Sequence, residues 1–334
     1  MIGWWNVDCG STVQRLGPNS LMWTTDKDFT KFGFNKLVAR RFFYGNYDGN
    51  SSPPTFDLYI DNIKWSTVNT YTIGGPIYVE ALHMTRGFGS IRVCLRQTNE
   101  AEIPFISSLE AVPFCVYLYK KMESNATFAL VNRVNFGRNE VRFSASFSEE
   151  KYNRIWTQAA TPWDCIEART LPDSTALPDS DAPDSVLRSS IVSPNIFTPI
   201  TLSVDLPPNQ ATPQTAYFVF YFTEVVKRTA SNDRRIVDIY INGMKMDTVE
   251  AEVNKCKVVT LYPVTVVGPT INITLRPASF STLPPMISAM EVFTRIVYGP
   301  AHGNILTSGT QDHFISVYLT LIQVFLLVNA LINI

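Results

Sequence analysis

Two short segments of the chain alternate apolar and polar residues with the two-residue period of a β-strand. Phe56–Ile60 and Val237–Ile241 each place three apolar side chains on one face, and an aspartate and a tyrosine on the other. A turn follows both segments. The second turn is Asn-Gly, a pair that tolerates positive φ and joins antiparallel strands tightly. The alternation predicts antiparallel sheets with one buried face and one polar face.

A second pair of segments has the same spacing, which indicates an internal duplication. Pro104–Glu110 and Pro285–Glu291 share the pattern Pro-x-Ile-Ser-x-x-Glu. They lie 181 residues apart (291 − 110), as do Asp57 and Asp238 (238 − 57). Two unrelated motifs displaced by one common distance predict the tandem repeat of a whole domain.

Further strand-like runs occur in both halves, and no long helical pattern interrupts them. At the same offset Leu37–Tyr44 aligns with Phe218–Val225, so the strand before the first pair of segments is duplicated too. We therefore predict an all-β protein with two tandem β-sandwich, jelly-roll-like domains. The domains are residues 1–122 and 123–298, and a linker with a hydrophobic tail follows at 299–334.

The tail predicts membrane association. Residues 314–334 carry no charged side chain, and about 20 apolar residues suffice to cross a bilayer. A removable lipid-anchor signal is the alternative, with the small residues Ser308, Gly309 and Thr310 before a short polar spacer. At the other end, the first residues show neither a basic region nor an apolar core typical of a signal peptide.

Composition and charge argue against several functional classes. The formal net charge is −1 and no Lys/Arg cluster occurs, so we expect no nucleic-acid partner. Three histidines and five cysteines without a Cys-x-x-Cys pair give little material for a metal site, and we expect no metal and no cofactor. No kinase catalytic loop or magnesium-binding motif is present. The chain is predicted not to be an enzyme.

Three Asn-x-Ser/Thr triplets are typical of a protein that enters the secretory pathway. They predict glycosylation at Asn50, Asn125 and Asn272. Asn272 falls in a β-like run, so a glycan there requires an outward-facing side chain.

The order of the motifs resembles the malectin-like extracellular domain of plant receptor-like kinases. The matching segments run in order from Trp4 to Phe293, and include Val7–Gly10, Trp23–Asp26, Phe43–Gly49, Phe56–Tyr59, Val93–Leu95, Pro104–Ser107 and Tyr152–Trp156. The resemblance implies two tandem malectin sandwiches that face the cell exterior and bind carbohydrate or peptide ligands. Family members carry a further segment between the positions of Asn35 and Lys36, and the first domain here lacks it.

The resemblance also directs attention to a candidate ligand site. Sugar rings pack on aromatic faces, while carboxylates and amides bind their hydroxyls. One loop of the first domain supplies such groups and Trp65 is expected nearby, so the predicted ligand-binding residues are Tyr44, Asn46, Tyr47, Asp48 and Trp65. The alternative interpretation is that the two tyrosines pack under the loop and Asp48 caps a turn.

The resulting prediction is a non-enzymatic recognition module that binds carbohydrate or a peptide signal as a receptor-type ectodomain. It would be held at a membrane and face the cell exterior or the secretory lumen. The alternative is a kinase-less structural or decoy partner of a receptor-like kinase that binds no sugar. A glycosidase would need two convergent carboxylates, and only Asp57 and Glu110 offer themselves.

Overall fold

The computed structural model describes most of the chain between residues 5 and 332. The described residues are 5–9, 11–17, 21–25, 53–61, 63–71, 77–84, 89–100, 102–114, 119–123, 126–137, 139–142, 150, 152–162, 164–169, 182–207, 213–226, 228–253, 255–296, 313–319 and 325–332.

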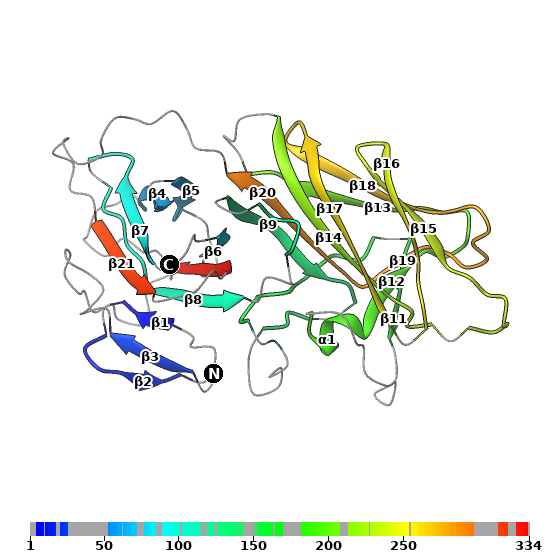
Figure 1. Ribbon diagram of the computed structural model, residues 1–334, viewed down its shortest axis with the longest axis horizontal. Helices are drawn as coiled ribbons and strands as arrows, with labels where there is room; N and C mark the ends of the chain where they lie inside the picture. The colour runs from blue at the N-terminus through cyan, green and yellow to red at the C-terminus, as the bar shows by residue number, and fades with distance from the viewer. Residues whose placement is uncertain are drawn as a thin grey trace. The chain divides into compact units, whose positions relative to one another are not determined.

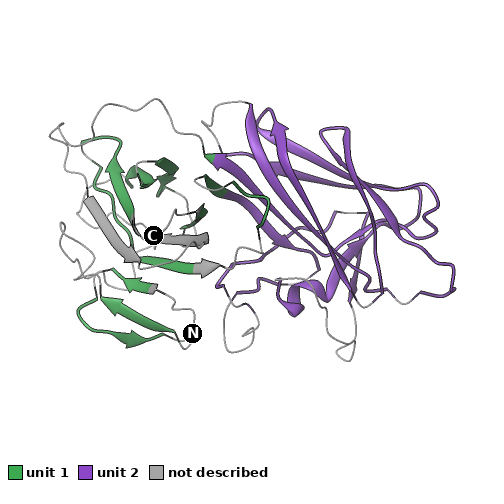
Figure 2. Ribbon diagram, in the orientation of Figure 1, with its two compact units in different colours: residues 1–129, 296–334 green, residues 130–295 purple. Residues whose placement is uncertain are grey.

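These residues form two compact units (Figure 2). The first contains residues 1–129 and 296–334, and the second contains residues 130–295. Regular structure in the described stretches is almost entirely β-strand, with one short helix, α1 (Asp184–Leu187) (Figure 1). The predicted all-β class with two tandem sandwiches is confirmed.

The second unit contains two four-stranded layers and a smaller sheet. Its strands are β9 (Thr127–Asn135), β10 (Thr157–Gln158), β11 (Ile166–Arg169), β12 (Ser189–Val192), β13 (Ile200–Asp205), β14 (Gln214–Thr223), β15 (Ile236–Ile241), β16 (Met244–Glu250), β17 (Cys256–Val266), β18 (Thr270–Pro277), β19 (Met286–Ile287) and β20 (Ala289–Ile296). One layer has the order β17-β14-β20-β9, with β10 beside β9. The other has the order β13-β18-β15-β16, and β11-β12-β19 form the small sheet.

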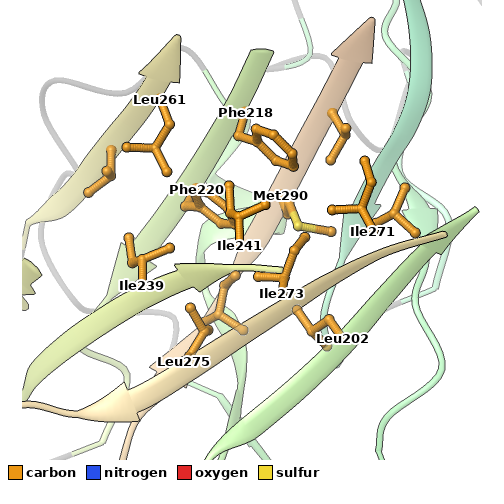
Figure 3. Close-up of a cluster of buried hydrophobic side chains, with 14 of the residues drawn as sticks. Leu202, Phe218, Phe220, Ile239, Ile241, Leu261, Ile271, Ile273, Leu275 and Met290 are labelled. Carbon is orange, nitrogen blue, oxygen red and sulfur yellow. The ribbon is translucent and has the colours of Figure 1, made fainter. Parts of the chain in front are cut away.

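Alternating side chains of these two layers make the core of the second unit (Figure 3). In β13 every second residue is buried, and the exposed positions between them are the polar residues Thr201, Ser203 and Asp205. From one layer Phe218, Phe220 and Met290 point toward residues such as Ile239 and Ile273 of the other layer. All five residues are at most 2% exposed. Burial of this alternating set is the main favourable term for the unit.

The first unit repeats the arrangement. Its strands are β1 (Trp5–Asp8), β2 (Arg15–Leu16), β3 (Met22–Thr25), β4 (Thr55–Ile60), β5 (Ile63–Asn69), β6 (Ile77–Met84), β7 (Gly89–Gln97), β8 (Ser108–Phe114), β21 (His313–Leu319) and β22 (Phe325–Ile332). One layer has the order β6-β22-β8-β1-β3-β2, and the other has the order β21-β7-β4-β5. Phe56, Leu58 and Ile60 of β4 are fully buried in the core of this unit.

The hairpins of the two units match down to their irregularities. β4 and β5 pair with a register shift between Leu58 and Tyr59, and β15 and β16 pair with a shift between Ile239 and Tyr240. A β-bulge at one fixed position increases the local twist and re-aims the following side chains. The shared bulge supports the duplication that the sequence predicts.

The apolar tail adopts a structure that we did not predict. Residues 313–319 pair antiparallel with β7 as β21, and residues 325–332 lie between β6 and β8 as β22. Among the described residues, no helix has both the length and the apolar character needed to cross a bilayer. The physical reason for the difference is that an uncharged apolar run suits an interior strand of a sheet as well as it suits hydrocarbon.

Candidate functional site

The loop predicted as the ligand site falls outside the part of the chain that the structure describes. Tyr44, Asn46, Tyr47 and Asp48 belong to the undescribed stretch 26–52. Their role as ligand residues therefore stays a prediction.

Trp65 lies in β5 and packs into the core of the first unit. Its side chain is 2% exposed and belongs to the same buried cluster as Phe56 and Leu58. The indole Nε1–H donates to the backbone oxygen of Glu80 at 3.2 Å. An indole enclosed in this way has no ring face available to a sugar, so the structure corrects its expected place beside the ligand. Ile63 and Val68 of the same strand are buried as well.

Of the three predicted glycosylation sites, the structure describes Asn272. Asn50 and Asn125 lie outside the described residues. Asn272 is exposed in β18 between the fully buried Ile271 and Ile273, so its side chain points outward. Its backbone N–H donates to Asn242 Oδ1 at 2.9 Å. The outward orientation meets the steric requirement of an attached glycan.

The two repeated aspartates bind groups of their own hairpins. Asp57 Oδ1 lies 2.9 Å from Lys64 Nζ and accepts the Thr67 hydroxyl at 2.7 Å. These contacts join β4 to β5 across the bulge. A carboxylate engaged in this way stabilises the hairpin, which agrees with a structural role for Asp57 rather than acid–base chemistry.

Asp238 forms the same pair of contacts in the second unit. It lies 2.8 Å from Lys245 Nζ and accepts the Thr248 hydroxyl at 2.6 Å. The hydrogen bond from the ammonium to Asp238 raises the pKa of Lys245. The preserved contacts assign the two aspartates one common function in the fold.

A buried network of charged residues lies within the second unit. Arg133 Nε is 2.7 Å from Glu291 Oε2, and the Tyr221 hydroxyl donates to Glu291 Oε1 at 2.7 Å. Nearby, Arg154 donates twice to the Glu150 carboxylate, at 3.0 and 3.2 Å. Both ion pairs have fully buried side chains. Buried charges persist only when paired and hydrogen-bonded, and these are.

Trp156 connects the two ion pairs. Its Nε1–H donates to Glu150 Oε2 at 2.9 Å. The guanidinium carbons of Arg133 and Arg154 lie 5.7 and 5.2 Å from the centroid of its ring. Cations over an aromatic face are attracted by its quadrupole. The network thus brings two guanidinium groups close to one fully buried tryptophan ring, and both of its carboxylates are buried and ion-paired.

The charges in this network control the ionisation of Glu291. Burial alone would raise the pKa of this carboxyl, but the charges of Arg133 and Arg154 and the hydrogen bonds from Tyr221 and Arg133 lower it below its ordinary value. The group is therefore held as a carboxylate. Across the described residues, no group of three His, Cys, Asp or Glu side chains is placed to bind a metal ion.

Two aromatic side chains project from the second unit where one would expect burial. Phe197 is 89% exposed and Phe280 is 84% exposed. Phe197 precedes β13 and Phe280 follows β18, and these neighbouring strands pair Ile200 with Leu275. Both rings therefore emerge beyond the same end of one sheet. Isolated aromatics carry no periodic signal, so the sequence did not indicate this surface.

The loop that carries Phe197 is built around an asparagine. Asn195 Oδ1 accepts the N–H groups of Phe197 and Thr198 at 2.8 and 3.0 Å. The Ser193 hydroxyl donates to the backbone oxygens of Asn195 and Thr198 at 3.1 and 2.7 Å. These local bonds fix the loop backbone, so the exposed ring is presented by an ordered turn.

Phe280 has a backbone conformation that few residues other than glycine adopt. Its φ is +66°, in the left-handed region that disfavours bulky side chains. The hydroxyl of the following Ser281 accepts the Ile236 N–H at 3.0 Å, and Thr282 N–H donates to Arg234 O at 2.8 Å. Residues with strained backbone conformations cluster at functional sites, so the positive φ makes Phe280 a candidate contact residue. We name Phe197 and Phe280 together the aromatic pair.

Comparisons with known proteins agree with this architecture. The family model of the malectin-like domain matches residues 29–295. A relative from Arabidopsis thaliana, named as a probable LRR receptor-like serine/threonine-protein kinase, is 29% identical over 275 residues, which cover 81% of this chain and 30% of that protein. The chain thus spans under a third of the length of such curated relatives.

Solved structures share the fold. The ectodomain of ANX2 from Arabidopsis thaliana superposes with a TM-score of 0.58 at 12% identity, covering 88% of this chain and 97% of that one. A chain from a complex of the plant peptide RALF23 with FER and LLG2 superposes with a TM-score of 0.53 at 12% identity, covering 88% and 95%. With the family match over most of its length, the chain belongs to the malectin-like domain family.

Proposed function

We propose that this chain is a non-enzymatic recognition module on the extracellular side of the cell, and that its ligand is a secreted peptide. The observation that carries the proposal is the family match over residues 29–295, with relatives named as receptor-like kinases. A structural neighbour was solved with the plant peptide RALF23, which favours a peptide over other ligands. Carbohydrate binding through the loop at 44–48 is the second candidate, supported by its aromatic and amide composition.

The aromatic pair is the contact surface that we propose for this ligand. Interfaces concentrate their binding energy in a few aromatic anchors, and exposed aromatics on ordered loops bind with little loss of conformational entropy. Phe197 and Phe280 have both properties. Their rings suit apolar peptide side chains as well as the C–H faces of sugars.

Binding by single-site variants tests the proposal. The secreted chain is titrated with RALF23 and, separately, applied to a glycan array. We expect Phe197→Ala and Phe280→Ala each to weaken peptide binding at least about tenfold, because truncating an aromatic anchor costs roughly 2 kcal/mol or more. Met244→Ala is the matched control. Met244 is 69% exposed but lies at the turn between β15 and β16, at the opposite end of the same sheet.

Three results would separate the candidates. Weakening by the two phenylalanine variants but not by Met244→Ala supports the peptide surface. Selective saccharide binding that depends on the loop at 44–48 supports the second candidate. A chain that binds neither ligand, yet co-purifies with a receptor-like kinase, supports a structural partner without a ligand of its own.

We also propose that Asn272 carries an N-linked glycan. The support is its exposed position in β18 within an Asn-Ile-Thr triplet. Asn272→Gln and Thr274→Ala should remove the same mass from the secreted chain, because both destroy the acceptor triplet. Ser203→Ala, a change at the register partner of Asn272, should remove none. A chain with no glycan at this peptide would rule the site out.

A further inference from the structure

β13 is the terminal strand of its sheet and has a neighbouring strand on one side. Its residues, Ile200–Asp205, pair antiparallel with β18, and the sheet continues from β18 to β15 and β16. Among the residues that the structure describes, no strand pairs with the other side of β13. A terminal strand presents backbone N–H and C=O groups to which a further extended chain can bind.

The hydrogen bonds to β18 show which residues of β13 direct these groups outward. Leu206 N–H, directly after β13, donates to Pro269 O at 2.7 Å, one step beyond the last cross-strand pair of β13 and β18. In an antiparallel pair, residues bonded to the neighbouring strand alternate with residues whose N–H and C=O point away from it. Because position 206 is bonded to the β18 side, the even-numbered residues of β13 are bonded too. Thr201, Ser203 and Asp205 therefore direct their N–H and C=O groups to the open edge.

The bonds on the other side of β18 agree with this assignment. Asn242 N–H donates to Asn272 O at 2.8 Å, and Ala278 N–H donates to Ile236 O at 2.9 Å. The even-numbered residues along β18 thus bond toward β15, which leaves its odd-numbered residues to bond β13. Each odd-numbered residue of β18 lies opposite an even-numbered residue of β13. Both sets of bonds therefore leave the odd-numbered residues of β13 facing the open edge.

The three outward-directed residues are accessible to a ligand. Thr201, Ser203 and Asp205 are exposed, and the residues between them are buried in the core. Within the described part of the chain, the backbone N–H groups of these three residues have no acceptor. The edge thus offers three donors and three acceptors of the kind that an extended chain satisfies.

β13 lacks the features that commonly block a terminal strand. Bulges, proline and lysine disfavour the addition of another strand. β17 carries Lys257 and Pro263 and has a register shift against β14, and β16 carries Lys245 and has a shift against β15. β13 contains neither proline nor lysine, and its pairing with β18 runs without a shift. Its regular edge therefore suits the binding of an extended chain.

The open edge begins at the aromatic pair and ends at a carboxylate. Phe197 shortly precedes Ile200, and Phe280 follows the end of β18 that pairs with Ile200. At about 3.4 Å per residue, an extended chain runs roughly 17 Å from Ile200 to Asp205. Asp205 is the charged residue of β13, and its side chain is exposed. Residues opposite each other on paired strands share a face, so a basic residue opposite Asp205 complements its charge.

From this arrangement we infer that the peptide ligand binds as an added strand along β13, with an apolar residue at the aromatic pair and a basic residue opposite Asp205. The inference rests on the proposed function and names the conformation and chemistry of the bound segment. Main-chain bonds to the edge supply affinity, and the two end contacts supply sequence preference. Asn272 lies on β18, one strand further in, and its side chain leaves through the face of the sheet, so a glycan there leaves the edge open.

A proline at position 203 tests the edge in the full chain. Ser203→Pro removes an outward N–H group and no bond to β18, and proline is tolerated in a terminal strand at such a position. It should weaken RALF23 binding about fivefold or more, because one main-chain bond is lost and the ring occupies the edge. Ser203→Ala is the matched control, since it removes the hydroxyl but keeps the N–H, and it should bind as the unaltered chain does. Unchanged binding by a Ser203→Pro chain whose circular dichroism shows the native fold would overturn the inference.

Residue-resolved amide exchange of the unaltered chain gives a second measurement that needs no variant. With RALF23 bound, the amides of residues 201, 203 and 205 should become protected, while those of residues 202 and 204 are protected with or without the peptide. This alternating pattern confirms an added strand.

The other outcomes separate the inference from the proposed function. Protection of residues 193–199 by bound peptide, without a change at 201, 203 and 205, would overturn the added strand and leave the proposed function standing. A chain that does not bind RALF23 contradicts the proposed function, and the inference fails with it. Protection of the three amides in a dimer free of peptide would assign the edge to a second copy of the chain and overturn the inference.

Discussion

Asp57 and Asp238, one in each half of the chain, make the same two contacts at almost the same distances. Each carboxylate binds a lysine across its hairpin, at 2.9 and 2.8 Å, and a threonine hydroxyl, at 2.7 and 2.6 Å. Because the two carboxylates make the same contacts, the duplication preserved a stabilising interaction rather than a catalytic group.

The first prediction follows from this equivalence. Asp57→Asn should lower the free energy of unfolding of the first unit, and Asp238→Asn that of the second, each by about 1 kcal/mol. The estimate combines a partly exposed ion pair with a hydrogen bond to a charged group. Urea denaturation followed by a probe in each unit measures both. Unequal effects, with one aspartate dispensable and the other costing several kcal/mol, would contradict a shared role.

The second prediction concerns the buried network. Glu291→Gln should destabilise the second unit by roughly 3 kcal/mol or more, because it leaves the Arg133 guanidinium buried without its counter-ion. Glu110→Gln is the matched control. It changes the repeat counterpart of Glu291 in β8, which is only half-buried, and should cost less. Equal losses of unfolding free energy in the two variants would show that burial of the Arg133–Glu291 ion pair does not determine the size of the loss.

The pH dependence of this effect has a definite sign. The pKa of Glu291 is lowered in the folded chain, so its contribution is present above the unfolded glutamate pKa of about 4.3 and is lost as pH falls through the lower folded value. The stability difference between the wild-type chain and Glu291→Gln should therefore shrink below about pH 4. Denaturation at a series of pH values checks this. A difference that stays constant to about pH 3 would contradict the lowered pKa.

The fourth prediction concerns strain at Phe280. Phe280→Gly should raise the free energy of unfolding, by up to about 1 kcal/mol, because glycine adopts positive φ without steric cost. It should also weaken ligand binding. Asn242→Gly is the control. Asn242 has a φ of +48°, but its side chain accepts the Asn272 N–H, so removing it should stabilise nothing. A destabilised Phe280→Gly chain would refute the strain argument.

The fold could be predicted from the sequence because both copies of the duplicated domain keep the same local pattern of apolar and polar residues. The alternation in Phe56–Ile60 and Val237–Ile241, with a shared offset, predicted two strands that the structure places at equivalent positions of two sandwiches. Such strands have one buried and one polar face, and the two faces produce a two-residue alternation in the sequence.

The strands formed by the C-terminal residues could not be predicted from the sequence in the same way. Residues 325–332 are almost uniformly apolar, so they show no alternation of apolar and polar residues. From sequence alone such a run is interpreted as a membrane segment. Asn329 is the informative position, but its meaning depends on Glu80 and Glu110, more than 200 residues away in the sequence (329 − 110 = 219). Pairing over such distances is a property of the folded chain.

Of the five predicted ligand residues, Trp65 is the one that the structure describes. Trp65 was expected beside a ligand because tryptophan suits sugar rings, but the alternation of β5 places it on the buried face with Ile63. Phe197 and Phe280 lie in loops, where neither period nor motif separates a functional aromatic from an incidental one. Their exposure is visible only in three dimensions.

Hydrogen exchange of the secreted chain with and without bound RALF23 tests the central claim most directly. If the chain is a peptide-recognition module that uses the aromatic pair, amides in 193–199 and 278–284 should become protected, while those of the turn at 242–243 should not change. No change at 193–199 and 278–284 at a saturating peptide concentration would contradict the claim.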